Sequence, residues 1–260
     1  MNVNTLKAVY FIGAGGIGMS ALVRYFLSKG KKVGGYDRTP SELTETLIKE
    51  GAAIHYEENV SLIPDDFLNP ETTLIVYTPA IPADHKELNY FREHGFEIQK
   101  RAQVLGMLTR TEKGLCVAGT HGKTTTSTMT AYLLDHSHVG CNAFLGGISK
   151  NYHTNLLLSD KSDFVVIEAD EFDRSFHWLT PYATVITATD SDHLDIYGTH
   201  EAYVDSAGRL PYHKKRDRSQ PGCTTRSDGV YLLHRRGGFP CRKHPDRKRR
   251  NLFRLHFSIG

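Results

Sequence analysis

The chain has 260 residues, of which 39% are hydrophobic and 23% are charged. This composition is typical of a globular protein with one large domain or two ordinary ones, and it excludes a chain that is disordered throughout. No apolar run is long enough for a membrane helix, no signal peptide is recognisable at the N-terminus, and the four cysteines lack paired metal-binding spacing, so we expect a cytoplasmic protein.

The net charge of +3 is distributed unevenly along the chain. Residues 207–260 contain 15 Lys and Arg against 3 Asp and no Glu, which leaves 17 basic and 26 acidic residues in residues 1–206. The first part is therefore net −9 and the last part net +12. Apolar residues in 207–260 follow neither a strand period nor a helix period, so we expect a basic, disordered tail.

Residues 1–110 alternate strand-like apolar runs with amphipathic stretches. This pattern predicts an α/β fold with βαβ units on a Rossmann-like parallel sheet. The expected strands are 8–12, 32–36 and 73–77, and the expected helices are 19–28, 42–50 and 84–95.

A glycine-rich turn joins the first expected strand to the first expected helix, and its residues 13–18 match the pattern G-x-G-x-x-G. Glycines let the backbone approach a diphosphate, whose charge is favoured by the start of the helix. Asp37 follows the second strand, where an acidic residue contacts a ribose. A nicotinamide dinucleotide, any other ribose diphosphate and a ligand-free tight turn all remain open at this point. The candidate ligand contacts are Gly15, Gly16, Ile17, Gly18 and Asp37, with Thr78, Pro79 and Ala80 at a second edge of the pocket.

A second α/β unit begins after a boundary near residues 108–114, with expected strands at 115–118, 163–168 and 183–188 and a helix at 126–134. Its first turn contains the Gly-Lys-Thr core of a phosphate-binding P-loop, although Val117 stands where the usual motif has its first glycine. In a P-loop the backbone N–H groups and the Lys bind phosphates and the Thr hydroxyl binds Mg²⁺. The residues of this turn are Gly119, Thr120, His121, Gly122, Lys123, Thr124 and Thr125.

Acidic residues follow the next two expected strands of this unit. Glu168, Asp170 and Glu171 lie within four positions, and Asp190, Asp192 and His193 follow the strand after that. Adjacent carboxylates repel one another unless a cation lies between them, and Mg²⁺ prefers oxygen ligands. An exposed acidic turn and an ordinary surface histidine are the alternative interpretations.

Together these motifs resemble the Mur ligase family over residues 5–206. The resemblance implies that residues 1–110 form a domain that binds the UDP of a UDP-sugar. It further implies that residues 111–206 are part of a central ATP-binding domain of the P-loop ATPase type. The segments that carry the resemblance are 13–20, 119–125, 168–171 and 192–197.

The resemblance also implies a reaction in peptidoglycan precursor synthesis. ATP and Mg²⁺ convert the carboxylate of UDP-N-acetylmuramate into an acyl phosphate, and the amine of L-alanine then displaces phosphate. By motif position, Lys123 contacts the ATP phosphates, Thr124 and Glu168 bind a first Mg²⁺, and His193 binds a second. Lys123, Glu168 and His193 are therefore the expected catalytic residues.

The resemblance stops near Ser206, where the charge balance inverts. We therefore expect residues 207–260 to be the product of a shifted reading frame, and the chain to be a truncated ligase without activity.

Two other functions explain single features. An NAD-dependent oxidoreductase accounts for the first glycine turn only, and nucleic-acid binding accounts for the basic tail but not for the acidic body. Zinc at Cys223, Cys241, His234 and His244 fits no common ligand spacing.

Overall fold

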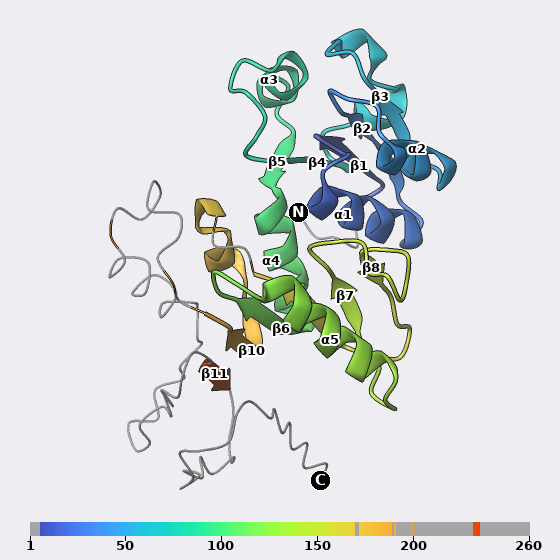
Figure 1. Cartoon of the computed structure of the whole chain (residues 1–260). Helices are drawn as coiled ribbons and strands as arrows, with labels where there is room; N and C mark the ends of the chain where they lie inside the picture. The colour runs from blue at the N-terminus through green and yellow to red at the C-terminus, as the bar shows by residue number, and fades with distance from the viewer. Residues whose placement is uncertain (1–5, 170–171, 189, 191–198, 200–230, 235–260) are drawn as a thin grey trace, which may run out of the picture.

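The computed structural model describes residues 6–169, 172–188, 190, 199 and 231–234 (Figure 1). Four of the expected site residues, Asp170, Glu171, Asp192 and His193, lie outside the described residues, as does most of the segment 207–260. Among the described residues, none of the helices has the length and apolar character needed to cross a membrane.

The first sheet is parallel, with strand order β3-β2-β1-β4-β5, and confirms the predicted Rossmann-like fold. The chain runs from β1 to β2 and β3 on one side of the sheet and then crosses to β4 and β5 on the other, so a crevice lies between the carboxyl ends of β1 and β4. The strands are β1 (Ala8–Ile12), β2 (Lys32–Tyr36), β3 (Ala53–His55), β4 (Thr73–Tyr77) and β5 (Glu97–Lys100). Between them lie α1 (Ile17–Ser28), α2 (Glu42–Lys49), α3 (Lys86–Glu93) and the short 3₁₀ helices η1 (Val60–Leu62) and η2 (Asp65–Phe67).

The second sheet has the order β11-β10-β6-β9-β7-β8. Its four inner strands are parallel, and β8 and β11 pair antiparallel at the two edges. The strands are β6 (Lys113–Ala118), β7 (Asn142–Phe144), β8 (Leu156–Leu157), β9 (Phe164–Glu168), β10 (Pro181–Ile186) and β11 (Tyr231–His234). Helix α4 (Arg101–Thr111) ends the first unit and leads into β6, and the helices of the second half are α5 (Lys123–Asp135) and the 3₁₀ helix η3 (Phe172–Trp178).

Strand β11 differs from the expectation that residues 207–260 contribute no regular structure. Its four residues pair with β10, from Ile186 opposite Tyr231 to Ala183 opposite His234. An edge strand offers unpaired backbone groups to any extended segment, and the run Tyr-Leu-Leu has high strand propensity. The local sequence therefore suffices to extend the sheet by one strand.

The helices differ in how their first turns are capped. Helix α2 begins with a capping box in which the Thr44 amide donates to Ser41 Oγ and the Ser41 amide donates to Thr44 Oγ1. Helices α1 and α5 follow the glycines Gly16 and Gly122 and have no side-chain cap. Because the first N–H groups of a helix have no intrahelical acceptor, α1 and α5 present these donors to a ligand.

One apolar core extends across both sheets. Residues of α1 such as Leu22 and Phe26 belong to the same cluster as Phe144 of β7 and Ile167 of β9. The rings of Tyr25 and Phe144 lie 5.5 Å apart between centroids, and Figure 1 shows α1 beside the loops of the second sheet. Helix α4 contacts β4 and β5 on one side and β6 on the other. The two units are therefore packed against each other.

A buried polar cluster lies within the other core of the first sheet. Glu87 is fully buried; its Oε2 accepts the Tyr10 hydroxyl at 2.8 Å and its Oε1 accepts the Asn59 amide at 3.1 Å. The Tyr10 hydroxyl also lies 2.6 Å from His55 Nε2. Burial raises the pKa of Glu87 to about 7 and lowers the pKa values of His55 and His85.

Candidate functional site

The glycine turn before α1 occupies the crevice of the first sheet. The Gly13 and Ala14 amides both donate to the Tyr36 carbonyl, which ties the turn to the end of β2. The Gly15 amide donates to Asp37 Oδ2 at 2.7 Å, and the Asp37 amide donates to the His55 carbonyl. The carboxylate predicted to meet a ribose therefore lies at the turn, held in place by backbone contacts.

A cavity of about 290 Å³ begins at this turn and extends to the second sheet. On the first unit it is lined by the start of α1 and by Thr78, while Pro79 and Ala80 are exposed and do not line it. On the second unit it is lined by residues 144–146, at the end of β7, and by Glu168 at the end of β9. The remaining lining residues include Arg101 and Leu105 of α4. The cavity thus joins two motifs that lie about 150 positions apart in the sequence.

Arg101 brings a positive charge to the first turn of α1. A Cβ placed on Gly18 would overlap the Arg101 guanidinium, so the absence of a side chain at position 18 lets this group approach the helix. A guanidinium beside the uncapped start of a helix forms a site for anions such as phosphate. Sequence reasoning missed Arg101, because the helix that it opens follows a short strand with no clear apolar pattern.

The Gly-Lys-Thr turn lies between β6 and α5. Gly119 and Gly122 adopt positive φ angles of 120° and 81°. Lys123 Nζ donates to the Gly119 carbonyl at 2.8 Å, so the ammonium group lies over the loop. The Thr120 amide donates to the Ala188 carbonyl at 3.1 Å, which fixes the loop against the segment after β10.

Thr124, in the first turn of α5, and Glu168, at the end of β9, meet beside the cavity. Thr124 Oγ1 donates to Glu168 Oε1 at 3.0 Å. Glu168 also lines the cavity that starts at the glycine turn. Because β6 and β9 are parallel neighbours, their carboxyl ends bring the P-loop and this carboxylate to the same edge of the sheet.

The remaining predicted residues of the P-loop differ in exposure. His121, Gly122 and Thr125 are exposed, while Gly119 and Thr120 are buried against the segment that follows β10. His121 Nε2 lies 3.9 Å from Asp190 Oδ2, and both side chains are solvent-exposed. No group of three or more metal-binding His, Cys, Asp or Glu side chains was found within the described residues. The site described here therefore rests on the cavity, Arg101, Lys123, Thr124 and Glu168.

Comparisons with known families match both halves of the chain. A model described as "Mur ligase family, catalytic domain" matches residues 8–113, and one described as "Mur ligase middle domain" matches residues 117–219. The second match extends beyond Ser206, where the sequence resemblance was expected to stop.

Curated relatives and solved structures agree with these matches. UDP-N-acetylmuramate–L-alanine ligases of Phocaeicola vulgatus and Parabacteroides distasonis are 77% and 71% identical over 222 and 206 residues, which are 85% and 79% of this chain. These alignments cover 47% and 45% of the relatives, so the chain spans about half their length. The structure of the UDP-N-acetylmuramate-alanine ligase of Thermotoga maritima matches with a TM-score of 0.70 and 31% identity, covering 78% of this chain and 46% of that one.

Proposed function

Because the chain belongs to the Mur ligase family, we propose that it binds UDP-N-acetylmuramate and ATP for the ligation of L-alanine to the muramoyl carboxylate. The observation that carries this proposal is the cavity shared by the two units, which has the glycine turn at one end and Glu168 at the other. Such a cavity suits a substrate whose nucleotide binds at one end and whose carboxylate reacts at the other.

In the proposed complex the diphosphate lies at the first turn of α1. The N–H groups of residues 16–18 and the guanidinium of Arg101 supply the positive potential there. Asp37, next to the turn, accepts a ribose hydroxyl. The sugar then extends along the wall formed by residues 144–146 toward Glu168.

The donor set at Thr124 and Glu168 fits Mg²⁺. A hydroxyl oxygen and a carboxylate oxygen lie 3.0 Å apart, and both are hard oxygen ligands of the kind that Mg²⁺ accepts together with phosphates and waters. His193, proposed for a second ion, lies outside the described residues. When bound, Mg²⁺ would neutralise negative charge on the ATP phosphates.

The proposed reaction has two steps. A carboxylate oxygen of the muramoyl group attacks the terminal phosphorus of ATP, which forms an acyl phosphate and releases ADP. The amine of L-alanine then attacks the acyl carbon, and inorganic phosphate leaves. Lys123 holds the transferred phosphoryl group electrostatically, and the cavity positions the carboxylate, so the protein acts mainly through placement and charge.

Calorimetric titration of the whole chain with UDP-N-acetylmuramate, UDP and NAD tests the binding half of this proposal. We expect UDP-N-acetylmuramate to bind more tightly than UDP, because it reaches the second unit, and NAD to bind more weakly than either. Tighter binding of NAD would show that the glycine turn belongs to an oxidoreductase. Release of phosphate from MgATP that requires both UDP-N-acetylmuramate and L-alanine tests the ligation half, and its detection would contradict the expectation that this chain, which spans about half the length of its relatives, is inactive.

A further inference from the structure

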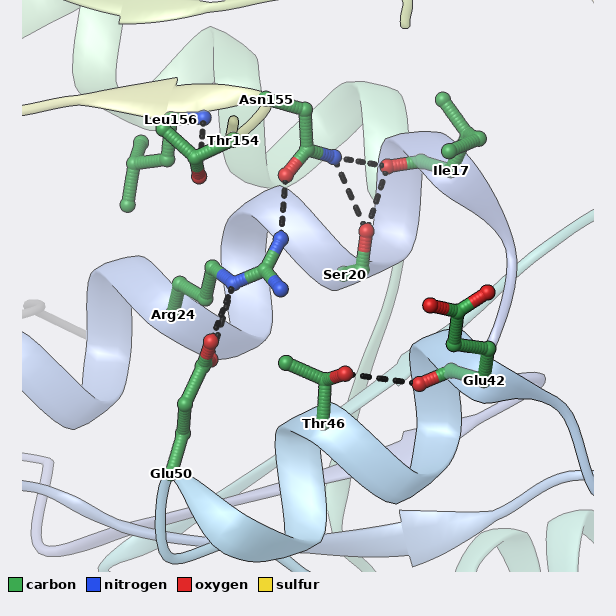
Figure 2. A network of polar contacts seen from close by, with 9 residues as sticks. All are labelled: Ile17, Ser20, Arg24, Glu42, Thr46, Glu50, Thr154, Asn155 and Leu156. Atoms are coloured by element: carbon green, nitrogen blue, oxygen red, sulfur yellow. Dashed lines mark hydrogen bonds and ion pairs between the residues drawn. The ribbon is translucent and has the colours of Figure 1, made fainter. Parts of the chain in front are cut away.

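A fully buried asparagine joins the two units, and Figure 2 shows its side chain with its polar partners. Asn155 precedes β8 in the second sheet, and its side chain reaches the first turn of α1. Its Nδ2 donates to the Ile17 carbonyl at 2.6 Å and to Ser20 Oγ at 2.9 Å. Its Oδ1 accepts from Arg24 Nη1 at 2.7 Å.

The orientation of this amide is determined by its neighbours. Ser20 Oγ uses its own hydrogen to donate to the Ile17 carbonyl at 2.8 Å, so it can only accept from Asn155. Arg24 is held by Glu50, which accepts from Arg24 Nε at 2.8 Å. Rotation of the amide by 180° would place an oxygen against two acceptors and an NH₂ group against a guanidinium. Both ends of the amide are therefore satisfied in one orientation only.

The backbone of Asn155 contacts the second unit, whereas its side chain contacts the first. Its carbonyl accepts the Leu145 amide at 2.9 Å, and Leu145 and Gly146 line the cavity. Gly146 lies against the Glu168 carboxylate so closely that a Cβ at this position would overlap it. One residue therefore connects the first turn of α1 to the wall that carries Glu168.

We propose that Asn155 is a positioning residue that sets the distance between the diphosphate end of the cavity and the Thr124–Glu168 end. It touches none of the reacting groups. Asn155 affects the affinity for a substrate that spans the cavity, because such a substrate must contact α1 and the second sheet at once. UDP alone contacts only the first unit. This inference rests on the proposed function for its choice of ligands.

The experiment compares Asn155→Asp and Asn155→Ala with the wild-type chain. Aspartate keeps the shape of the side chain but removes the two N–H donors, and alanine removes the whole connection. Asn142→Ala is the matched control, because Asn142 is also a buried asparagine but bonds only within the second unit, to Glu112, Ser162 and Ser159. Each variant is titrated with UDP and with UDP-N-acetylmuramate.

Both Asn155 variants should keep the UDP affinity within about twofold of the wild-type value. The ratio of the affinity for UDP-N-acetylmuramate to the affinity for UDP should fall about tenfold, which is an ordinary size for coupling between two sites. Asn142→Ala should keep that preference. An unchanged preference in both Asn155 variants would overturn the inference, as would an equal loss in Asn142→Ala, because loss of general stability would then explain the effect.

Scanning calorimetry without ligand separates this inference from the proposed function. The wild-type chain and the variants should each unfold in one transition, because one apolar core extends across both sheets, and the Asn155 variants should unfold at a lower temperature because they lose polar contacts between the units. If the wild-type chain binds neither nucleotide, the proposed function fails and calorimetry alone decides: a single unshifted transition in both Asn155 variants would refute the positioning role.

Discussion

At the scale of single residues, the guanidinium of Arg101 lies against α1 at Gly18, where a side chain would exclude it. We predict that Arg101→Ala weakens UDP binding by about tenfold or more, because a charge-assisted hydrogen bond contributes about 1.5–3 kcal/mol. Isothermal titration with UDP measures the effect. Arg110→Ala is the control, since Arg110 is exposed in the last turn of the same helix. Equal losses in the two variants would mean that only the net charge matters.

Glu87 makes stability depend on pH. Its pKa is raised by burial from 4.5 to about 7, so between these values the folded chain keeps a proton that the unfolded chain has lost. Stability from this group is full below pH 4.5 and falls as the pH rises to about 7. His55 and His85 act in the opposite sense, because their lowered pKa values reduce stability as the pH falls below 6.5.

The variant Glu87→Gln isolates the carboxyl contribution. A glutamine can donate to Tyr10 and accept from Asn59, so the contacts of Glu87 have neutral equivalents. We predict that the variant gains on the order of 2 kcal/mol over the wild-type chain at pH 8 and much less at pH 5. Urea unfolding at the two pH values measures this difference, and a gain independent of pH would contradict the assignment.

Some residues of the candidate site could be predicted from the sequence and others could not. Lys123 and Thr124 follow from a short motif because phosphate loops need those residue types in one stretch of chain. Arg101 and Asn155 each act alone, far in sequence from the groups that they serve. Only the packing of α4 and of the segment before β8 reveals their roles.

At the scale of elements, the P-loop and the glycine turn belong to different sheets. We predict that Lys123→Ala lowers the affinity for MgATP by at least tenfold, through loss of the ammonium at the phosphates, and leaves UDP affinity within about twofold. Titration of the variant with each nucleotide measures both effects. A parallel loss of UDP binding would show that the two loops are not independent binding elements.

The long buried elements were predictable from sequence. Expected strands at 8–12, 32–36 and 73–77 coincide with β1, β2 and β4, because each is a continuous run bounded by polar or turn residues. The strands β3, β5 and β7 have only three or four residues, and β5 reads Glu-Ile-Gln-Lys. These short strands form because neighbouring strands supply their partners, which no local pattern encodes.

At the scale of the whole molecule, the expectation of a shifted reading frame for residues 207–260 stays a prediction. It rests on the change in charge after Ser206, although β11 extends the sheet and the middle-domain match reaches residue 219. Sequencing the DNA around codon 206 in all three frames decides it. An alternative frame that encodes family-like sequence would support the prediction, and its absence would contradict it.

The central claim is that one cavity between the two sheets holds a UDP-sugar with its reactive end toward Thr124 and Glu168. A crystal structure of the chain with UDP-N-acetylmuramate tests this most directly. We expect density for the diphosphate at residues 16–18 beside Arg101 and for the muramoyl carboxylate at the Glu168 end of the cavity. Density for the nucleotide elsewhere, or for the sugar pointing away from the second sheet, would contradict it.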